Sequence, residues 1–268
     1  MTTIFDGRSF ADEKMEELKI ITNGLKSRGT TPHLASILVG NDEASKLYMR
    51  LKKKAAERIG AEFDAYFLPE RVNPTVIFDL IESLNADESV QGVMIQMPIP
   101  DNLLNQKEKI INAIDPEKDV DGLLADSQFL HPTSRAVIDI LKEAQKDVQP
   151  LLRKGSFVVA VIGSMGMVGK PLVRELKKEG YKVLEADGKV TDLSKITSLA
   201  DVVISATGVA GLIKPEMIKE GAVVIDVGSP RGDFESSVSD KASFFTPVPG
   251  GVGPVTISCL LENLISSC

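Results

Sequence analysis

Tryptophan is absent from this chain of 268 residues, and aromatic residues make up only 5% of it. Proteins that bind single-stranded nucleic acids stack the bases on aromatic side chains, so a surface of that kind is not expected. The net charge of −7 also argues against the broad basic surface that nucleic-acid binding requires. No apolar run approaches the length of a membrane span, and the N-terminus has no apolar signal-peptide segment. We therefore expect neither a nucleic-acid partner nor a membrane partner.

Cysteine and histidine are also scarce, with two residues of each. Cys259 and Cys268 lie near the C-terminus and are expected to be free thiols in a cytoplasmic protein. His33 and His131 are far apart and lack the neighbouring cysteines or acidic residues of a zinc site. His33 follows Pro32 in an expected loop and should be exposed. No Gly-x-Ser-x-Gly motif occurs, so a serine–histidine mechanism is not expected either.

Both halves of the chain alternate short apolar strands with amphipathic helices. This alternation predicts an α/β fold with parallel sheets and crossover helices. The first helix is expected to start at a capping box at residues 9–12 and to end near Gly29. In a charged loop, Asp119 and Asp121 can cap a helix, bind a ligand or bind a metal, and two carboxylates alone make metal the weakest option. Residues 147–156 are expected to connect the halves.

A glycine-rich turn stands out in the second half. A run of β-branched residues ends at Gly163, and Gly166 and Gly169 follow at the start of a helical pattern. A strand, a tight turn and a helix N-terminus in this order favour a dinucleotide pyrophosphate, although such turns also occur for packing alone. A phosphate-binding P-loop is excluded, because Ser164 stands where its first glycine is required and Pro171 replaces its Ser or Thr.

Asp187 ends the strand that follows the glycine-rich turn. In a dinucleotide-binding fold, an acidic residue here accepts a hydrogen bond from the ribose 2′-hydroxyl and repels a 2′-phosphate, which favours NAD over NADP. The alternative is a turn-forming aspartate before Gly188, and Lys189 nearby could weaken the preference for NAD.

Three polar residues in the first half are candidates for proton chemistry. Tyr48 and Lys52 share one face of an expected helix, although the neighbouring lysines are also typical of a solvated basic face. The Tyr–Lys pair can transfer protons if burial lowers the pKa of the lysine. Gln96 lies within an apolar strand, where its amide needs a hydrogen-bond partner, and a structural role and a site role are both open.

These motifs together resemble one family over nearly the whole chain, that of methylenetetrahydrofolate dehydrogenase/methenyltetrahydrofolate cyclohydrolase. The segments that carry the resemblance are residues 48–54, 92–100, 118–122, 163–169, 224–228 and 246–254. The resemblance implies two α/β domains around a cleft, the second a Rossmann-like dinucleotide-binding domain. Residues 1–133, completed by a helix at 255–268, would bind folate, and residues 134–254 would bind NAD or NADP.

The resemblance also assigns site residues. Lys52 would be the catalytic lysine, with Tyr48 against the folate, Gln96 bonded to the lysine and Asp121 holding the pterin. The implied substrate contacts are completed by Met97, Pro98, Pro249, Gly250 and Gly251. The implied cofactor contacts are Gly163, Ser164, Met165, Gly166, Val168, Asp187, Gly188, Ala206, Thr207, Gly208 and Ser229.

The activity implied is oxidation of 5,10-methylenetetrahydrofolate with hydride transfer to NAD(P), followed by hydrolysis to 10-formyltetrahydrofolate, with no metal required. A homodimer through the Rossmann-like side is also implied. A dehydrogenase without the hydrolase activity, and an inactive relative that binds NAD or folate, are the alternatives.

The sequence departs from the family pattern at four places. Ser164-Met165 replaces Arg-Ser, and Asp187-Gly188 replaces His-Ser; both changes favour NAD. His131-Pro132-Thr133-Ser134 replaces Pro-Cys-Thr-Pro at the expected domain junction. Val227-Gly228-Ser229-Pro230 replaces Val-Gly-Ile-Asn where the nicotinamide is expected.

Overall fold

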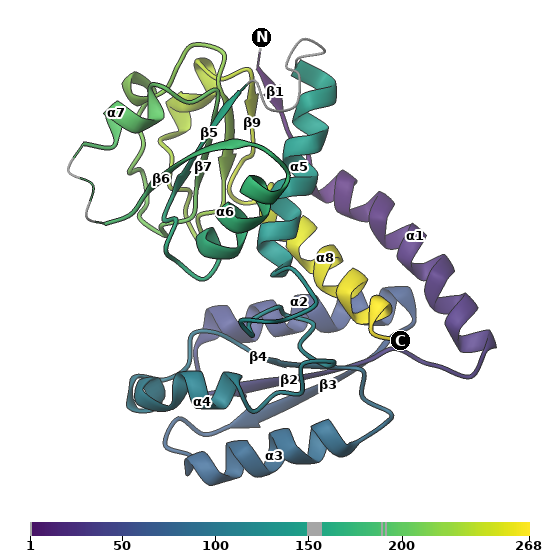
Figure 1. Ribbon diagram of the computed structural model, residues 1–268. Coiled ribbons are helices and arrows are strands. Elements are labelled where there is room, and N and C mark those ends of the chain that lie inside the picture. The colour runs from purple at the N-terminus through teal and green to yellow at the C-terminus, as the bar shows by residue number, and fades with distance from the viewer. Residues whose placement is uncertain (1, 149–156, 189, 191) are drawn as a thin grey trace. The chain divides into compact units, whose positions relative to one another are not determined.

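The computed structural model describes residues 2–148, 157–188, 190 and 192–268 (Figure 1). These residues form two compact units. The three-stranded unit consists of Asp12–Pro132 and Ile257–Cys268, and the six-stranded unit consists of the described residues in Thr133–Thr256 together with residues 2–11. No helix within the described ranges has both the length and the apolar character to cross a membrane.

The three-stranded unit is built on a parallel sheet in the order β3-β2-β4. Its strands are β2 (His33–Val39), β3 (Glu62–Leu68) and β4 (Gly92–Ile95). The crossovers contain α2 (Glu43–Ile59) and α3 (Pro74–Ala86), and the 3₁₀-helix Asp101–Gln106 and α4 (Lys107–Ile111) follow β4. Asp42 caps α2 by accepting a hydrogen bond from the Ser45 amide, and Gly60 ends the helix in the left-handed conformation.

The central strand β2 is buried on both faces, and its side chains alternate between two apolar cores. Leu34 belongs to a core that includes Met15 of α1 (Gly7–Ser27) and Leu264 of α8 (Val252–Ser266). Ile37 belongs to the core on the other face, with Ile81 of α3 and other apolar residues. The sheet is therefore covered on both sides, as parallel sheets usually are.

The six-stranded unit contains a parallel sheet in the order β1-β9-β8-β7-β5-β6. The strands are β1 (Thr3–Ile4), β5 (Val158–Ile162), β6 (Lys182–Ala186), β7 (Val202–Ser205), β8 (Val223–Asp226) and β9 (Phe244–Phe245). The helices are α5 (Pro132–Val148), α6 (Gly169–Lys178) and α7 (Ser194–Thr197), with 3₁₀-helices at Pro215–Met217 and Ser236–Asp240. The order changes direction at β5, which lies between β6 and β7.

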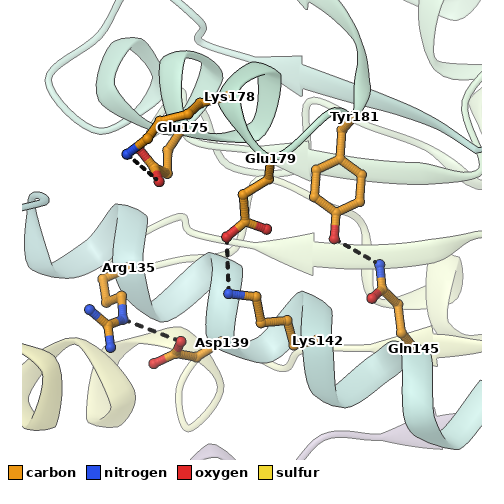
Figure 2. Close-up of polar contacts among 8 residues, drawn as sticks. All are labelled: Arg135, Asp139, Lys142, Gln145, Glu175, Lys178, Glu179 and Tyr181. Atoms are coloured by element: carbon orange, nitrogen blue, oxygen red, sulfur yellow. Dashed lines mark hydrogen bonds and ion pairs between the residues drawn. The ribbon is translucent and has the colours of Figure 1, made fainter. Parts of the chain in front are cut away.

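Polar and aromatic contacts fix α5 beside the end of α6 and the start of β6 (Figure 2). Lys142 Nζ lies 3.0 Å from Glu179 Oε1, and Gln145 Nε2 donates to Tyr181 Oη at 3.1 Å. The ring of Tyr181 also contacts Phe157, with ring centroids 5.3 Å apart. Since an exposed ion pair stabilises little, the buried Tyr181–Phe157 contact contributes most of this packing.

Three expectations from the sequence are wrong. Residues 2–11 are expected in the first domain, but β1 pairs with β9 and so completes the six-stranded sheet. Asp6, not the segment beginning at Ser9, caps α1, because its carboxylate accepts hydrogen bonds from the Arg8 and Ser9 amides. His33 lies in β2 rather than in an exposed loop, and it is 8% exposed. Most of the expected connection at 147–156 lies outside the described residues.

Candidate active site

Lys52 differs from the other lysines of α2 because it is buried. Lys53 and Lys54 are exposed, whereas Lys52 is 9% exposed. Its Nζ donates a hydrogen bond to Gln96 Oε1 at 2.9 Å and lies 3.6 Å from Met94 Sδ. Tyr48 is half-buried one turn earlier on the same helix. The alternative of a solvated basic face therefore fits the neighbouring lysines but not Lys52.

Gln96 connects this lysine to the sheet. It follows β4 directly, and its backbone amide donates to Ile37 O at 2.8 Å. Its side-chain Nε2 donates to Met97 O at 3.0 Å, so the amide is oriented with its oxygen toward Lys52. Met97 is half-buried, and Pro98 after it is exposed. The buried amide thus has the hydrogen-bond partners that a buried polar group needs.

The loop after α4 contributes two carboxylates with different surroundings. Asp119 is fully buried and accepts hydrogen bonds from the amides of Leu123 and Leu124, which gives it a structural role in the loop. Asp121 is half-buried, and it is close enough to Lys52 to act on its charge. Of the expected pair, Asp121 is therefore the carboxylate whose charge acts on Lys52.

Burial and charge act in opposite directions on Lys52. Removal from water disfavours the charged amine and lowers its pKa, and the negative charge of Asp121 partly opposes this effect. At neutral pH the neutral form is therefore more populated than for a lysine in water. A neutral amine held by one hydrogen bond can accept a proton from a reacting molecule.

His131 belongs to the same cluster, although no functional role is predicted for it from the sequence. It is 7% exposed, and burial lowers its pKa, while Asp121 favours and Lys52 disfavours its charged form. The side chain of Asn263 donates to both Val120 O and Leu130 O, at 2.9 and 3.1 Å, and so keeps the two segments together. The only available signal was that a histidine stands in the altered Pro-Cys-Thr-Pro segment.

The glycine-rich turn of the six-stranded unit is closely packed at its first and third glycines. Gly163 has a positive φ of 82°, and a Cβ there would lie 2.6 Å from Ala206 O. A Cβ on Gly169 would lie 2.1 Å from Gly163 O, so the helix start needs glycine to approach the turn. The amides of Gly163 and Ser164 both donate to Ala186 O, at 2.8 and 3.1 Å. Packing thus explains two of these glycines, and the turn still precedes the N-terminus of α6.

The expected cofactor residues all follow the carboxyl ends of adjacent parallel strands. The glycine-rich turn, including Met165 and Val168, follows β5, and Asp187 and Gly188 follow β6. Ala206, Thr207 and Gly208 follow β7, and Ser229 lies after β8. In open parallel sheets, ligands bind at this edge where the strand order changes direction. The structure therefore brings these residues to the edge where a dinucleotide would bind.

Pro249, Gly250 and Gly251 lie in the six-stranded unit, in the loop between β9 and α8. The Gly251 amide donates to Pro247 O at 2.8 Å, and Gly250 has a positive φ of 107°. A Cβ on Gly7 would lie 1.9 Å from Gly251 O, so the start of α1 packs directly against this loop. These contacts give the loop a defined conformation within its unit.

Two family models cover most of the chain. The model for the tetrahydrofolate dehydrogenase/cyclohydrolase catalytic domain matches residues 5–121. The model for the NAD(P)-binding domain of the same family matches residues 131–268.

Solved structures agree with these matches. The bifunctional enzyme FolD, a methylenetetrahydrofolate dehydrogenase/cyclohydrolase from Campylobacter jejuni, is 38% identical, with a TM-score of 0.92 over 100% of this chain and 98% of that chain. The Trypanosoma brucei enzyme complexed with NADP and an inhibitor is 31% identical, with a TM-score of 0.90 over 99% and 97%. The NAD-dependent dehydrogenase from Saccharomyces cerevisiae is 25% identical, with a TM-score of 0.81 over 99% and 96%.

Proposed function

Since the chain belongs to the tetrahydrofolate dehydrogenase/cyclohydrolase family, we propose that the hydrolysis reaction depends on Lys52 and that NAD is the preferred hydride acceptor. The protein is an enzyme that oxidises 5,10-methylenetetrahydrofolate to 5,10-methenyltetrahydrofolate and hydrolyses this product to 10-formyltetrahydrofolate. The observation that supports the role of Lys52 most directly is its burial together with its 2.9 Å hydrogen bond to Gln96.

The oxidation requires little proton transfer by the side chains of the protein. When bound, the cofactor would supply a nicotinamide ring to accept the hydride that leaves the methylene carbon. The residues of the chain bind and orient the two molecules, with Tyr48 against the folate and Asp121 holding the pterin. Holding the reacting atoms close together accounts for much of the rate in such a step.

Hydrolysis needs proton transfer, and Lys52 is suited to it. Water attacks the methenyl carbon and loses a proton, which the neutral amine of Lys52 accepts. The carbon–nitrogen bond of the five-membered ring then breaks as the ring nitrogen takes up this proton from Lys52. The hydroxyl group that water left on the carbon gives up its remaining proton, first to the neutral amine of Lys52 and then to solvent, and becomes the formyl oxygen. Gln96 Oε1 orients the amine throughout, because it accepts one of its hydrogen bonds.

The preference for NAD rests on residues at the strand ends. Asp187 follows β6, where its charge would repel a 2′-phosphate, and Gly188 beside it is exposed. Ser164, which stands in the place of the family's arginine, is 3% exposed and offers no positive charge to a phosphate. The relatives use both cofactors, since one is complexed with NADP and another is NAD-dependent. The choice is therefore made by local residues and not by the fold.

We also propose that the protein is a homodimer that associates through the six-stranded unit. The support is the family resemblance. Size-exclusion chromatography with light scattering tests this directly, because a particle of about the monomer mass of 28.9 kDa would contradict it.

Lys52→Met tests the central part of the proposal. The variant keeps the length of the side chain and removes the amine, so methenyltetrahydrofolate hydrolysis should fall by about 10²–10⁴-fold, the usual contribution of a general base. Lys54→Met is the matched control, because it makes the same change at an exposed position of the same helix. NAD binding should be unchanged in both variants.

The outcomes separate the alternatives. Hydrolysis that continues in Lys52→Met would overturn the role of Lys52. An unmodified protein that accelerates only the oxidation would be a dehydrogenase without the hydrolase activity. An unmodified protein that binds NAD and folate but reduces no cofactor would be an inactive relative.

A further inference from the structure

Asp233 is a fully buried carboxylate in the six-stranded unit to which the resemblance assigned no role. Its Oδ2 accepts three hydrogen bonds: from Ser205 Oγ at 2.7 Å, from the Thr207 amide at 2.7 Å and from Thr207 Oγ1 at 2.8 Å. All three donors belong to the end of β7 or to the turn after it. One carboxylate oxygen therefore fixes the exit of the chain from β7.

A second buried carboxylate fixes the segment that carries Asp233. Asp226, the last residue of β8, accepts hydrogen bonds from the amides of Gly228, Asp233 and Phe234, at 2.8, 3.0 and 3.2 Å. The loop after β8 is thereby folded back until Asp233 reaches β7. The two carboxylates connect the exits of neighbouring strands β8 and β7.

The glycines of this loop leave room for the two carboxylates. A Cβ on Gly228 would lie 2.6 Å from Asp233 Oδ1, and a Cβ on Gly232 would lie 2.4 Å from Asp226 Oδ2. Asp233 Oδ1 itself is buried and has no hydrogen-bond partner within the described part of the chain. Leaving a buried carboxylate oxygen unsatisfied costs free energy, so the contacts of Oδ2 must offset that cost.

The turn that Asp233 holds contacts the glycine-rich turn. Ala206 precedes Thr207, and its amide donates a hydrogen bond to Ile162 O at 2.9 Å. Gly163 approaches the carbonyl of Ala206 closely, since a Cβ on Gly163 would lie only 2.6 Å from the Ala206 oxygen. Thr207 Oγ1 also accepts from the Val209 amide at 3.2 Å. The position of Asp233 therefore sets the spacing between the turns after β5 and β7.

We propose that Asp233 is a positioning residue for NAD(P) binding, because it holds the 206–208 turn against the glycine-rich turn and in register with the turn after β8. Asp233 does not touch the cofactor in this arrangement; it acts through Thr207 and its neighbours. The inference rests on the proposed cofactor site at this edge of the sheet. Loss of three charge-assisted hydrogen bonds allows the turn to move, which weakens cofactor binding.

The test uses the full-length protein with NAD as the probe and compares four variants. Asp233→Ala removes all three bonds, and the dissociation constant of NAD should rise by at least about tenfold, since a single hydrogen bond to a charged group is worth about that much. Asp233→Asn keeps an acceptor oxygen and should restore part of the affinity. Ser205→Ala removes one donor that is fully buried and therefore cannot contact NAD. Asp240→Ala is the control at an exposed position of the same unit.

The hydrolase activity distinguishes positioning from a loss of folding. It is assayed with methenyltetrahydrofolate in the absence of NAD, and Lys52 and Gln96 belong to the other unit. All variants should therefore retain a hydrolysis rate within about twofold of that of the unmodified protein. The KM for NAD should rise in Asp233→Asn and rise further in Asp233→Ala. Unchanged NAD affinity in Asp233→Ala, or hydrolysis that falls in parallel with it, would overturn the inference.

If Asp233→Ala does not fold, Ser205→Ala decides, because it should raise the dissociation constant of NAD by about threefold or more. An unchanged constant in that variant contradicts the inference. A different result would contradict the proposed function itself, namely that the unmodified protein binds neither NAD nor NADP.

Discussion

Two substitutions of Gln96 should shift the pH dependence of hydrolysis in opposite directions. In Gln96→Leu the buried amine of Lys52 loses the acceptor that lies 2.9 Å from it. The charged amine donates a stronger hydrogen bond than the neutral amine, so the loss disfavours the charged form and lowers the pKa of Lys52. In Gln96→Glu a carboxylate takes the place of the amide, favours the charged form and raises that pKa.

The size of the shift follows from the hydrogen bond. A bond to a charged group contributes about 1.5–3 kcal/mol and a neutral bond about 0.5–1.5 kcal/mol, so the two protonation states differ by about 1 kcal/mol or somewhat more. One pKa unit corresponds to about 1.4 kcal/mol, so Gln96→Leu should move the acid limb of the profile down by about one pH unit. Gln96→Glu should move it upward by at least as much, because an opposite charge in a buried site acts more strongly than a dipole.

The assay is methenyltetrahydrofolate hydrolysis across the pH range, corrected for the spontaneous reaction at each pH. Gln128→Glu is the control, since it adds the same charge at an exposed position of the three-stranded unit. Its profile should match that of the unmodified protein. If both Gln96 variants lose rate without a shift of the limb, or if both shift in the same direction, Lys52 is not the group whose protonation limits the reaction.

Two further predictions concern the cofactor and pH. Asp187→Ser should lower the ratio of kcat/KM for NAD to kcat/KM for NADP by about tenfold, because the Asp187 carboxylate beside the 2′-phosphate of NADP costs on the order of 1 kcal/mol or more. A higher kcat/KM of the unmodified protein with NADP would refute the preference for NAD. Burial lowers the pKa of His131, so below about pH 6.5 this residue binds more protons in the unfolded protein than in the folded protein. The free energy of unfolding should therefore fall as the pH drops from about 6.5 toward the pKa of the folded state, by at most about 1.4 kcal/mol per pH unit. His131→Gln should flatten this dependence in urea denaturation, and an unchanged slope would assign it to other groups.

The α/β class and most strands could be predicted because their residues repeat the same pattern. The run of apolar residues from Leu34 to Val39 and the run that ends at Gly163 both read as buried parallel strands, and both are. Strand β1 was missed because its two residues carry no periodic pattern and gain their structure from β9, far along the chain. Neither the cytoplasmic location nor the homodimer is tested by the structure, and both stay predictions.

The candidate site could be predicted only in part. Spacing placed Tyr48 and Lys52 on one face of a helix, but spacing does not distinguish a buried lysine from the exposed Lys53 and Lys54. That distinction comes from the residue directly after β4, because Gln96 accepts a hydrogen bond from the amine of Lys52. His131 and Asp233 were not selected, because the burial of each depends on segments remote in sequence, as the contacts of Asn263 and Ser205 show.

The three places where the chain passes from one unit to the other all lie in helices. They fall after Ala11 in α1, after Pro132 in α5 and after Thr256 in α8. Leu260, Leu261 and Leu264, beyond the last of these points, belong to the same apolar core as Leu34. Neither unit is therefore encoded by a continuous stretch of the gene, and a break at the middle of the chain would leave each piece without part of its sheet or core. Recombination that exchanges one unit for a homologous one must replace separate segments together, so the two units are inherited as a single module.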